Sequence, residues 1–174
     1  LNLNAEDYET GKVKTLDELH NGALELTKVS PAAIAQLYSN DIVSRQTVLK
    51  KTKPLANQYF ILKNGSQSVL TRYHADDDIL MRIGKTSAFG VNPKNAEQTF
   101  ALDAVMDPEI QLVSIQGVAG TGKTLLSLAG ALEQRRLYHQ IYLARPIVPL
   151  SNKDIGYLPG DVNSKLNPYM EPLW

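Results

Sequence analysis

The chain has 174 residues, 43% of them hydrophobic, and its 18 basic and 18 acidic side chains give a formal net charge of zero. This length allows one or two domains, and the neutral balance excludes a protein that binds nucleic acid through bulk basic charge. The absence of cysteine excludes disulfides and thiolate metal sites. Together with the lack of an apolar run near the roughly 20 residues that cross a bilayer, it predicts a cytoplasmic protein with no membrane partner.

Residues 1–29 show no sustained periodicity, and we expect them to be the tail of an upstream domain. A helix is predicted to follow, because Ser30 is a good N-cap, Pro31 suits the first helical position and Asn40 suits the end. The chain begins with Leu1 rather than methionine. We therefore expect it to be an interior piece, or the ordered part, of a longer protein.

Residues 57–74 predict a β-hairpin. Two runs rich in β-forming residues, 59–63 and 68–73, flank Asn64-Gly65, which is the strongest short hairpin signal. A third strand is expected at Ile79–Ile83. We assign residues 30–88 to a small, mostly β connector module, which ends in a linker containing Gly84, Gly90 and Pro93.

The segment from Ile42 to Ala75 contains six cations and no acid. It could track the phosphates of a nucleic acid, with Tyr59, Phe60 and Tyr73 as stacking platforms. Alternatively, the aromatics form the inner face of the hairpin and the lysines protect a solvated edge. The six cations are Arg45, Lys50, Lys51, Lys53, Lys63 and Arg72.

A phosphate-binding loop is the most informative motif of the chain. A helix over residues 94–107 and a strand at Ile110–Gln116 lead into it, and a helix over Lys123–Arg136 follows. The loop reads Gly117, Val118, Ala119, Gly120, Thr121, Gly122, Lys123 and Thr124, which matches G-x-x-x-x-G-K-[ST] at every fixed position. The alternative is a glycine-rich turn that carries a surface lysine.

The chemistry of this loop follows from its residue types. Glycine tolerates positive φ, so successive backbone N–H groups can point into one concavity and bind the phosphates of ATP. Lys123 is expected between the β- and γ-phosphates, and the Thr124 hydroxyl is expected to coordinate Mg²⁺.

Two further residues are candidates for binding the nucleotide. Gln98, 19 residues before Gly117, can read an adenine edge because its amide both donates and accepts; it could equally be a surface glutamine. Arg145 ends a strand expected at Ile141–Arg145, where it could meet a phosphate or pair with a carboxylate.

The predicted fold class is α/β: a P-loop NTPase with a parallel sheet that is incomplete in this chain, preceded by the β-rich connector. Hydrolysis in this class needs an acid on a neighbouring strand to hold the magnesium. None of the acids after Thr124 ends an apolar strand, so we expect that residue to lie outside the chain. These acids are Glu133, Asp154, Asp161 and Glu171.

Several blocks of residues resemble the PhoH-like ATPases, over about residues 90–174. They are 95–103, 117–124, 144–150, 154–161 and 165–172, in the order of that family. The resemblance implies that residues 89–174 are the N-terminal part of a RecA-like ATPase domain. It also implies that Gln98 is the adenine-side glutamine, and that the opening residues end a PIN nuclease domain.

The resemblance further implies an ATPase that acts on single-stranded RNA as a helicase, coupled to a PIN nuclease outside this chain. It implies a ring-shaped homo-oligomer, a hexamer. A second hypothesis is a nucleotide-gated RNA-binding and ring-assembly module that unwinds nothing. A third, a P-loop kinase for a small molecule, is disfavoured because the segment after Arg145 matches the PhoH signature rather than an acceptor site.

Overall fold

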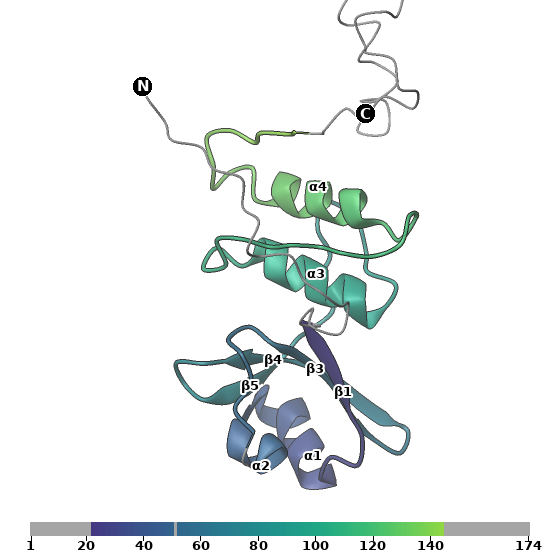
Figure 1. Ribbon diagram of the computed structural model, residues 1–174, viewed down its shortest axis with the longest axis vertical. Coiled ribbons are helices and arrows are strands. Elements are labelled where there is room, and N and C mark those ends of the chain that lie inside the picture. The colour runs from purple at the N-terminus through teal and green to yellow at the C-terminus, as the bar shows by residue number, and fades with distance from the viewer. Residues whose placement is uncertain (1–21, 51, 145–174) are drawn as a thin grey trace, which may run out of the picture. The chain divides into compact units, whose positions relative to one another are not determined.

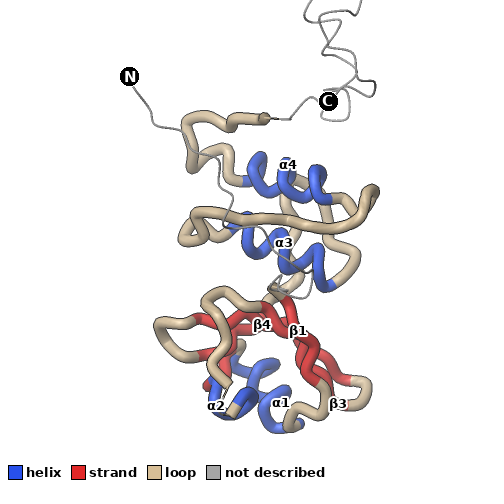
Figure 2. Tube along the Cα trace, viewed as in Figure 1, coloured by secondary structure: helices blue, strands red, loops and turns tan. Residues whose placement is uncertain are grey.

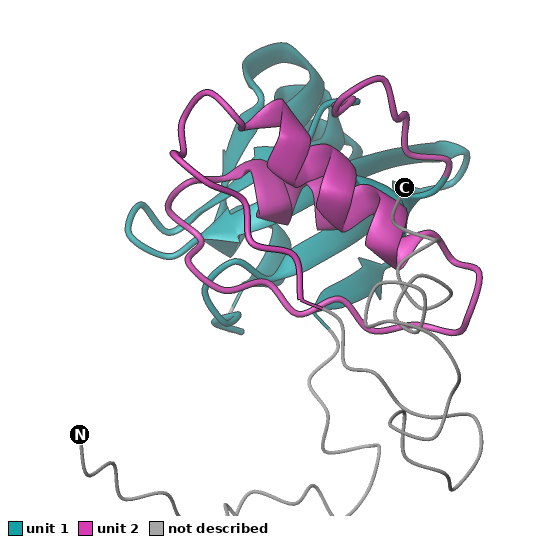
Figure 3. Cartoon of the chain, turned by 90° about the horizontal axis from the view of Figure 1, so that it is seen from above, with its two compact units in different colours: residues 1–85, 95–100 teal, residues 86–94, 101–174 magenta. Residues whose placement is uncertain are grey.

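The computed structural model describes residues 22–50 and 52–144 (Figure 1). The chain divides into two compact units (Figure 3): residues 1–85 with 95–100, and residues 86–94 with 101–174. We call the first the sheet unit and the second the loop unit. The elements are β1 (Ala23–Leu26), α1 (Pro31–Asn40), β2 (Ile42–Ser44), α2 (Arg45–Leu49), β3 (Tyr59–Asn64), β4 (Gln67–His74), β5 (Ile79–Arg82), α3 (Ala96–Met106) and α4 (Lys123–Glu133).

The sheet unit is built on five strands in the order β1-β3-β4-β5-β2. Figure 2 draws the strands in red. β1 runs parallel to β3, and the other neighbours are antiparallel. Helix α1 packs against β2, β3, β4 and β5 and so covers one face of the sheet. Within residues 30–88, which were expected to be mostly β, the structure combines two helices with four strands.

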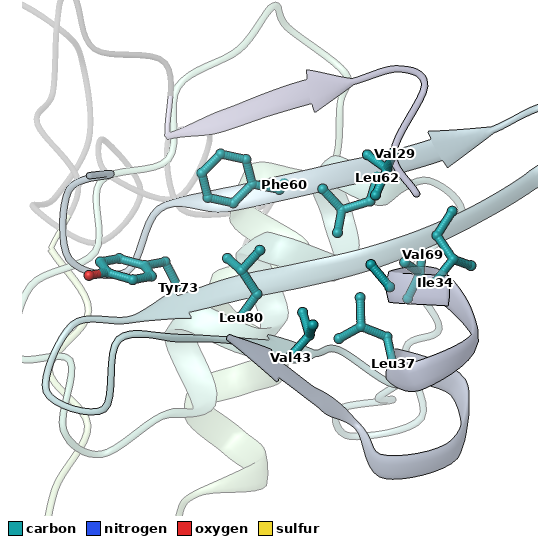
Figure 4. Packing of buried hydrophobic residues seen from close by; sticks show 10 residues of the cluster. Val29, Ile34, Leu37, Val43, Phe60, Leu62, Val69, Tyr73 and Leu80 are labelled. Carbon is teal, nitrogen blue, oxygen red and sulfur yellow. The ribbon is translucent and has the colours of Figure 1, made fainter. Parts of the chain in front are cut away.

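One hydrophobic core joins α1 to that face (Figure 4). Alternate residues of a strand point to the same side, so Phe60 and Leu62 of β3 meet Ile34 and Leu37 of α1. Tyr73, at the far end of β4, is also fully buried. Burial of these large side chains is the main force that holds the helix on the sheet.

The opposite face of the sheet is covered at β3 by the beginning of α3. Tyr59 points away from the α1 core and stacks on Phe100, with ring centroids 4.8 Å apart and an interplanar angle of 25°. Both rings are almost completely buried. Offset stacking of this kind adds to the free energy gained from burying the two rings.

The predicted hairpin and third strand are confirmed, with one difference at the turn. Asn64 pairs with Gln67, so the two-residue loop is Gly65-Ser66 rather than Asn64-Gly65. Gly65 has φ of 55° at the first turn position, as a type II′ turn requires. The side chain of Asn64 instead donates to the carbonyl of Val29, at 2.5 Å.

The sheet unit includes residues before position 30, although residues 1–29 were expected to be the tail of an upstream domain. Residues 23–26 form β1 beside β3, and Val29 lies in the core. Helix α1 begins at Pro31 as predicted, but the Ser30 side chain makes no capping hydrogen bond. The backbone carbonyl of Ser30 accepts from the N–H groups of Ala33 and Ile34 instead.

In the loop unit, the C-terminal half of α3 packs against α4, and both helices confirm the sequence prediction. The helices approach closely at Gly130, where an added Cβ would lie 2.5 Å from Cγ1 of Val105. Beyond α4, the Gln134 amide donates to the carbonyl of Val105 at 2.7 Å. This bond links the C-terminal ends of the two helices.

The strands predicted at 110–116 and 141–145 are not found. Residues 110–116 and 141–144 carry no strand and are largely exposed, and Arg145 lies outside the described residues. A parallel strand needs hydrogen-bonded neighbours and cover on both faces. The described part of the loop unit supplies no strand to pair with, so the RecA-like sheet is not present there.

Candidate phosphate-binding site

The phosphate loop begins α4 in a conformation that depends on glycine. Gly122 is the N-cap of α4, with φ of 85°, and Gly120 has φ of 80°. A side chain at either position would be strained. At Gly117 an added Cβ would lie 3.2 Å from the Thr121 hydroxyl, so that position is also tight. The loop therefore leads directly to a helix N-terminus, where unpaired N–H groups and the helix dipole favour an anion.

Lys123 bends back over the loop that precedes it. Its ammonium donates to the carbonyls of Gly117, at 2.8 Å, and Val118, at 2.7 Å. A third contact, to the Thr121 hydroxyl, is longer at 3.5 Å. An ammonium has three donors, so two are firmly used and the third contact is weak enough to be exchanged for a phosphate oxygen. The positive charge is thus already fixed beside the helix N-terminus.

The Thr121 hydroxyl supports the same arrangement, because it donates to the Val118 carbonyl at 2.9 Å. Thr124 is exposed in the first turn of α4. Within the described residues, no group of three or more His, Cys, Asp or Glu side chains could hold a metal ion. A single protein hydroxyl still fits Mg²⁺, because that ion keeps several waters and takes its other ligands from the phosphates.

Gln98 lies in the N-terminal turn of α3 and belongs to the sheet unit. Its backbone N–H donates to the side chain of Asn95 at 2.8 Å, so Asn95 is the residue that caps this helix. The Gln98 side chain is half-buried. Its contact with adenine stays a prediction, and Arg145 lies outside the described residues.

The basic segment has a structural role that its composition did not reveal. Arg45 pairs with Asp78, Lys63 pairs with Glu25 at 2.7 Å, and Arg72 is buried. The three aromatics proposed as stacking platforms, Tyr59, Phe60 and Tyr73, are also buried. The stacking role is therefore wrong for these three rings, since no base can reach them.

Sequence reasoning missed a polar network at one end of the sheet unit. Asp78 accepts two hydrogen bonds from Arg45, at 2.7 and 2.9 Å, and one from the Tyr73 hydroxyl, at 2.8 Å. The bonds from Arg45 and then from Tyr73 lower the pKa of Asp78 from 3.8 to about 2. The hydrogen bond to Asp78 raises the pKa of Tyr73. The only signal in the sequence was the acidic run Asp76-Asp77-Asp78.

None of the helices formed by residues 22–50 and 52–144 is long and apolar enough to cross a membrane.

A helix that begins at a glycine N-cap, directly after a loop of the G-x-x-x-x-G-K-[ST] pattern, is the local arrangement typical of P-loop proteins. Comparison with known proteins narrows the class. Residues 90–174 match the family model described as PhoH-like protein. Through this region the chain belongs to the PhoH family.

The relatives agree with this assignment. The chain is 36% identical to Protein PhoH2 of Bacillus subtilis (strain 168) over 182 residues, covering 100% of the chain and 40% of that protein. It is 34% identical to Protein PhoH2 of Thermobispora bispora over 178 residues, covering 100% of the chain and 39% of that protein. It is 30% identical to Protein PhoH of Escherichia coli (strain K12) over 146 residues, covering 76% of the chain and 39% of that protein. No solved structure gives a significant match.

The chain thus spans about 40% of the length of the first two of these relatives.

Proposed function

We propose that this chain binds Mg²⁺-ATP through residues 117–124 and forms part of an ATPase. One observation carries the proposal: the Lys123 ammonium is held by the carbonyls of Gly117 and Val118, beside a glycine-capped helix N-terminus. Fixing this charge before the nucleotide arrives avoids the entropic cost of ordering a long side chain on binding. The backbone N–H groups of the loop complete a cradle for the β- and γ-phosphates.

Each site residue has a distinct role in this proposal. Lys123 neutralises charge on the β- and γ-phosphates, and the Thr124 hydroxyl is one ligand of Mg²⁺. Gln98 reads the adenine, and Arg145 binds a phosphate. Mg²⁺, when bound, neutralises the charge that develops on the phosphates in the transition state.

The second part of the proposal is that ATP turnover drives work on RNA. It rests on the resemblance to the PhoH-like ATPases and on membership of that family. In this reading the chain acts in a homo-oligomeric ring, a hexamer, coupled to a PIN nuclease domain outside it. RNA-stimulated ATP hydrolysis by the intact protein is the expected behaviour of a motor. Turnover that RNA leaves unchanged would favour the second hypothesis, a nucleotide-gated ring-assembly module.

The substitution Lys123→Ala tests the phosphate site. The variant should fold normally, because Lys123 contributes only partly exposed bonds to the loop. It should bind Mg²⁺-ATP weakly or not at all, because the fixed charge facing the phosphates is lost. Binding of a fluorescent ATP analogue to the intact protein measures the effect, with circular dichroism as the check on folding.

Lys85→Ala is the matched control, because Lys85 is an exposed lysine outside the phosphate loop. It should bind the analogue as the wild type does. Wild-type nucleotide binding and hydrolysis by Lys123→Ala would contradict the assignment of the phosphate loop.

A further inference from the structure

A tight turn in the loop unit displays an aromatic ring. Ala88 and Val91 exchange both of their backbone hydrogen bonds, at 3.1 and 2.8 Å, which leaves Phe89 and Gly90 as a two-residue loop. Both loop residues have positive φ, 44° for Phe89 and 78° for Gly90. That pair of angles belongs to a type I′ turn, whose first position favours Asn, Asp or Gly. A bulky aromatic at that position is an outlier that costs free energy.

The turn is firmly held, although its aromatic ring is not buried. Ala88 is fully buried in the core of the loop unit, and Val91 packs against the same core. The Phe89 N–H donates to the carboxylate of Glu133 at 2.6 Å, which ties the turn to the end of α4. The Phe89 side chain nevertheless remains 50% exposed. Burial therefore does not offset the strained backbone, and the backbone hydrogen bond to Glu133 would form with any non-proline residue.

The surroundings of the ring suit a flat, polyanionic ligand. The Arg135 guanidinium lies over the Phe89 ring, 5.3 Å from its centroid, and Arg136 beside it in the chain is exposed. The nearby carboxylate of Glu133 is already engaged by the Phe89 N–H. Single-stranded nucleic acids bind where aromatic rings and guanidinium groups stack on bases and cations meet phosphates.

We propose that Phe89 is a stacking platform for a base of single-stranded RNA, with Arg135 and Arg136 meeting the adjoining phosphates. The proposal rests on the RNA-directed part of the proposed function. It also moves the aromatic contact from the buried rings Tyr59, Phe60 and Tyr73 to an exposed ring in the loop unit. The strained turn then has a purpose, because it holds the ring in place before the base arrives.

The decisive variant is Phe89→Asn in the intact protein. Asparagine suits the first position of a type I′ turn and keeps the N–H that Glu133 accepts, so the melting temperature should stay the same or rise. Binding of a short fluorescein-labelled oligouridine, measured by anisotropy with a non-hydrolysable ATP analogue present, should weaken roughly 5- to 150-fold. The dependence of affinity on salt should keep its slope, because no charge is removed.

Three further variants complete the experiment. Phe89→Trp should keep wild-type RNA affinity, because its ring stacks at least as well. Arg136→Ala should weaken binding and flatten the salt slope by about one unit or slightly less. Tyr38→Leu is the matched control: Tyr38 is also exposed beneath a guanidinium, that of Arg82, but it lies in a helix and has no strained backbone. This variant should bind RNA as the wild type does.

Wild-type RNA affinity in Phe89→Asn would overturn the proposal, whatever happens to the melting temperature. If Phe89→Asn caused the oligomer to dissociate, the turn would be an interface between protein subunits instead. If the wild-type protein bound the ATP analogue but no oligouridine, both the stacking platform and the RNA-directed function would be wrong. The proposed phosphate site would still be supported. If the wild type bound RNA and only the Phe89→Asn result failed, the platform alone would be wrong.

Discussion

Asp78 is a single residue on which one end of the sheet unit depends. It lies in the turn between β4 and β5 with φ of 52°, and it binds both Arg45 and Tyr73. Arg45 in turn donates to the carbonyl of Lys50, so the network also fixes the chain after α2. Since the side chain of Arg45 is only 12% exposed, water competes weakly for these bonds. The network joins β4, β5 and α2 at one point.

The lowered pKa of Asp78 makes the stability of the sheet unit depend on pH. The folded-state pKa is about 2, below the ordinary 3.8, so the unfolded chain binds more protons in this window. The stabilisation is complete above about pH 4 and is lost as the pH falls towards 2. Asp78→Asn should therefore lower the midpoint of urea unfolding at pH 7, and the difference from the wild type should shrink between about pH 4 and pH 2.

Asp77→Asn is the control for this measurement, because Asp77 is exposed in the same turn. It should leave the midpoint nearly unchanged. Parallel loss of stability in the wild type and Asp78→Asn across the acid range would show that this carboxylate does not carry the effect.

The backbone conformation of the loop could be predicted from its own residues, because Gly120 and Gly122 have the positive φ that glycine tolerates. The partners of the basic segment could not be predicted in this way. The role of Arg45 depends on Asp78, which lies 33 residues away, and the burial of Phe60 depends on the register of its strand. Composition shows that the segment is basic, but it does not show which cations have partners.

At the scale of elements, the contact between α3 and α4 depends on the absence of a side chain at Gly130. An added Cβ would lie 2.5 Å from Val105 Cγ1, well inside van der Waals contact. Gly130→Ala should therefore destabilise the loop unit by about 1–3 kcal/mol, even though alanine favours a helix. Thermal or urea unfolding of the chain would measure this loss of stability.

A second substitution identifies the cause of this loss. Val105→Ala removes the clashing methyl group, so combining it with Gly130→Ala should cost less than the sum of the two single changes. Gly84→Ala is the control, because a Cβ added at Gly84 would meet nothing within 4 Å and the residue has no positive φ; it should be neutral or slightly stabilising. Additive effects at positions 105 and 130 would contradict the close helix contact.

The elements that could be predicted are those with local signals. The turn residues of the β3–β4 hairpin, the Pro31 that begins α1 and the helical spacing of α4 all act over a few residues. β1 and β2 were missed because their partners are far away in the sequence: Ala23 pairs with Tyr59, and Ile42 with Met81. The strand predicted at 110–116 has suitable residues but no described neighbour, which a local pattern cannot reveal.

At the scale of the whole molecule, the described residues form two units with separate cores. One core joins α1 to the five-stranded sheet, and the other joins α3, α4 and the turn at residues 88–91. The first has its strands paired in a single sheet. The second carries exposed apolar side chains in the segments before and after α4 in the sequence, among them Leu112 and Tyr142. Among the described residues, the loop unit therefore exposes more large apolar side chains than the sheet unit.

Hydrogen exchange followed by mass spectrometry tests this difference between the units. In the 174-residue chain by itself, the amides of residues 111–116 should exchange fast, whereas those of β3 and β4 should be protected by paired neighbours. In a longer protein that supplies parallel strands on either side, residues 111–116 should become slow while β3 and β4 stay as they were. Fast exchange of 111–116 in both proteins would show that this segment is a loop and would remove the support for a P-loop sheet. Slow exchange in the shorter chain would show that it finds a partner within residues 1–174.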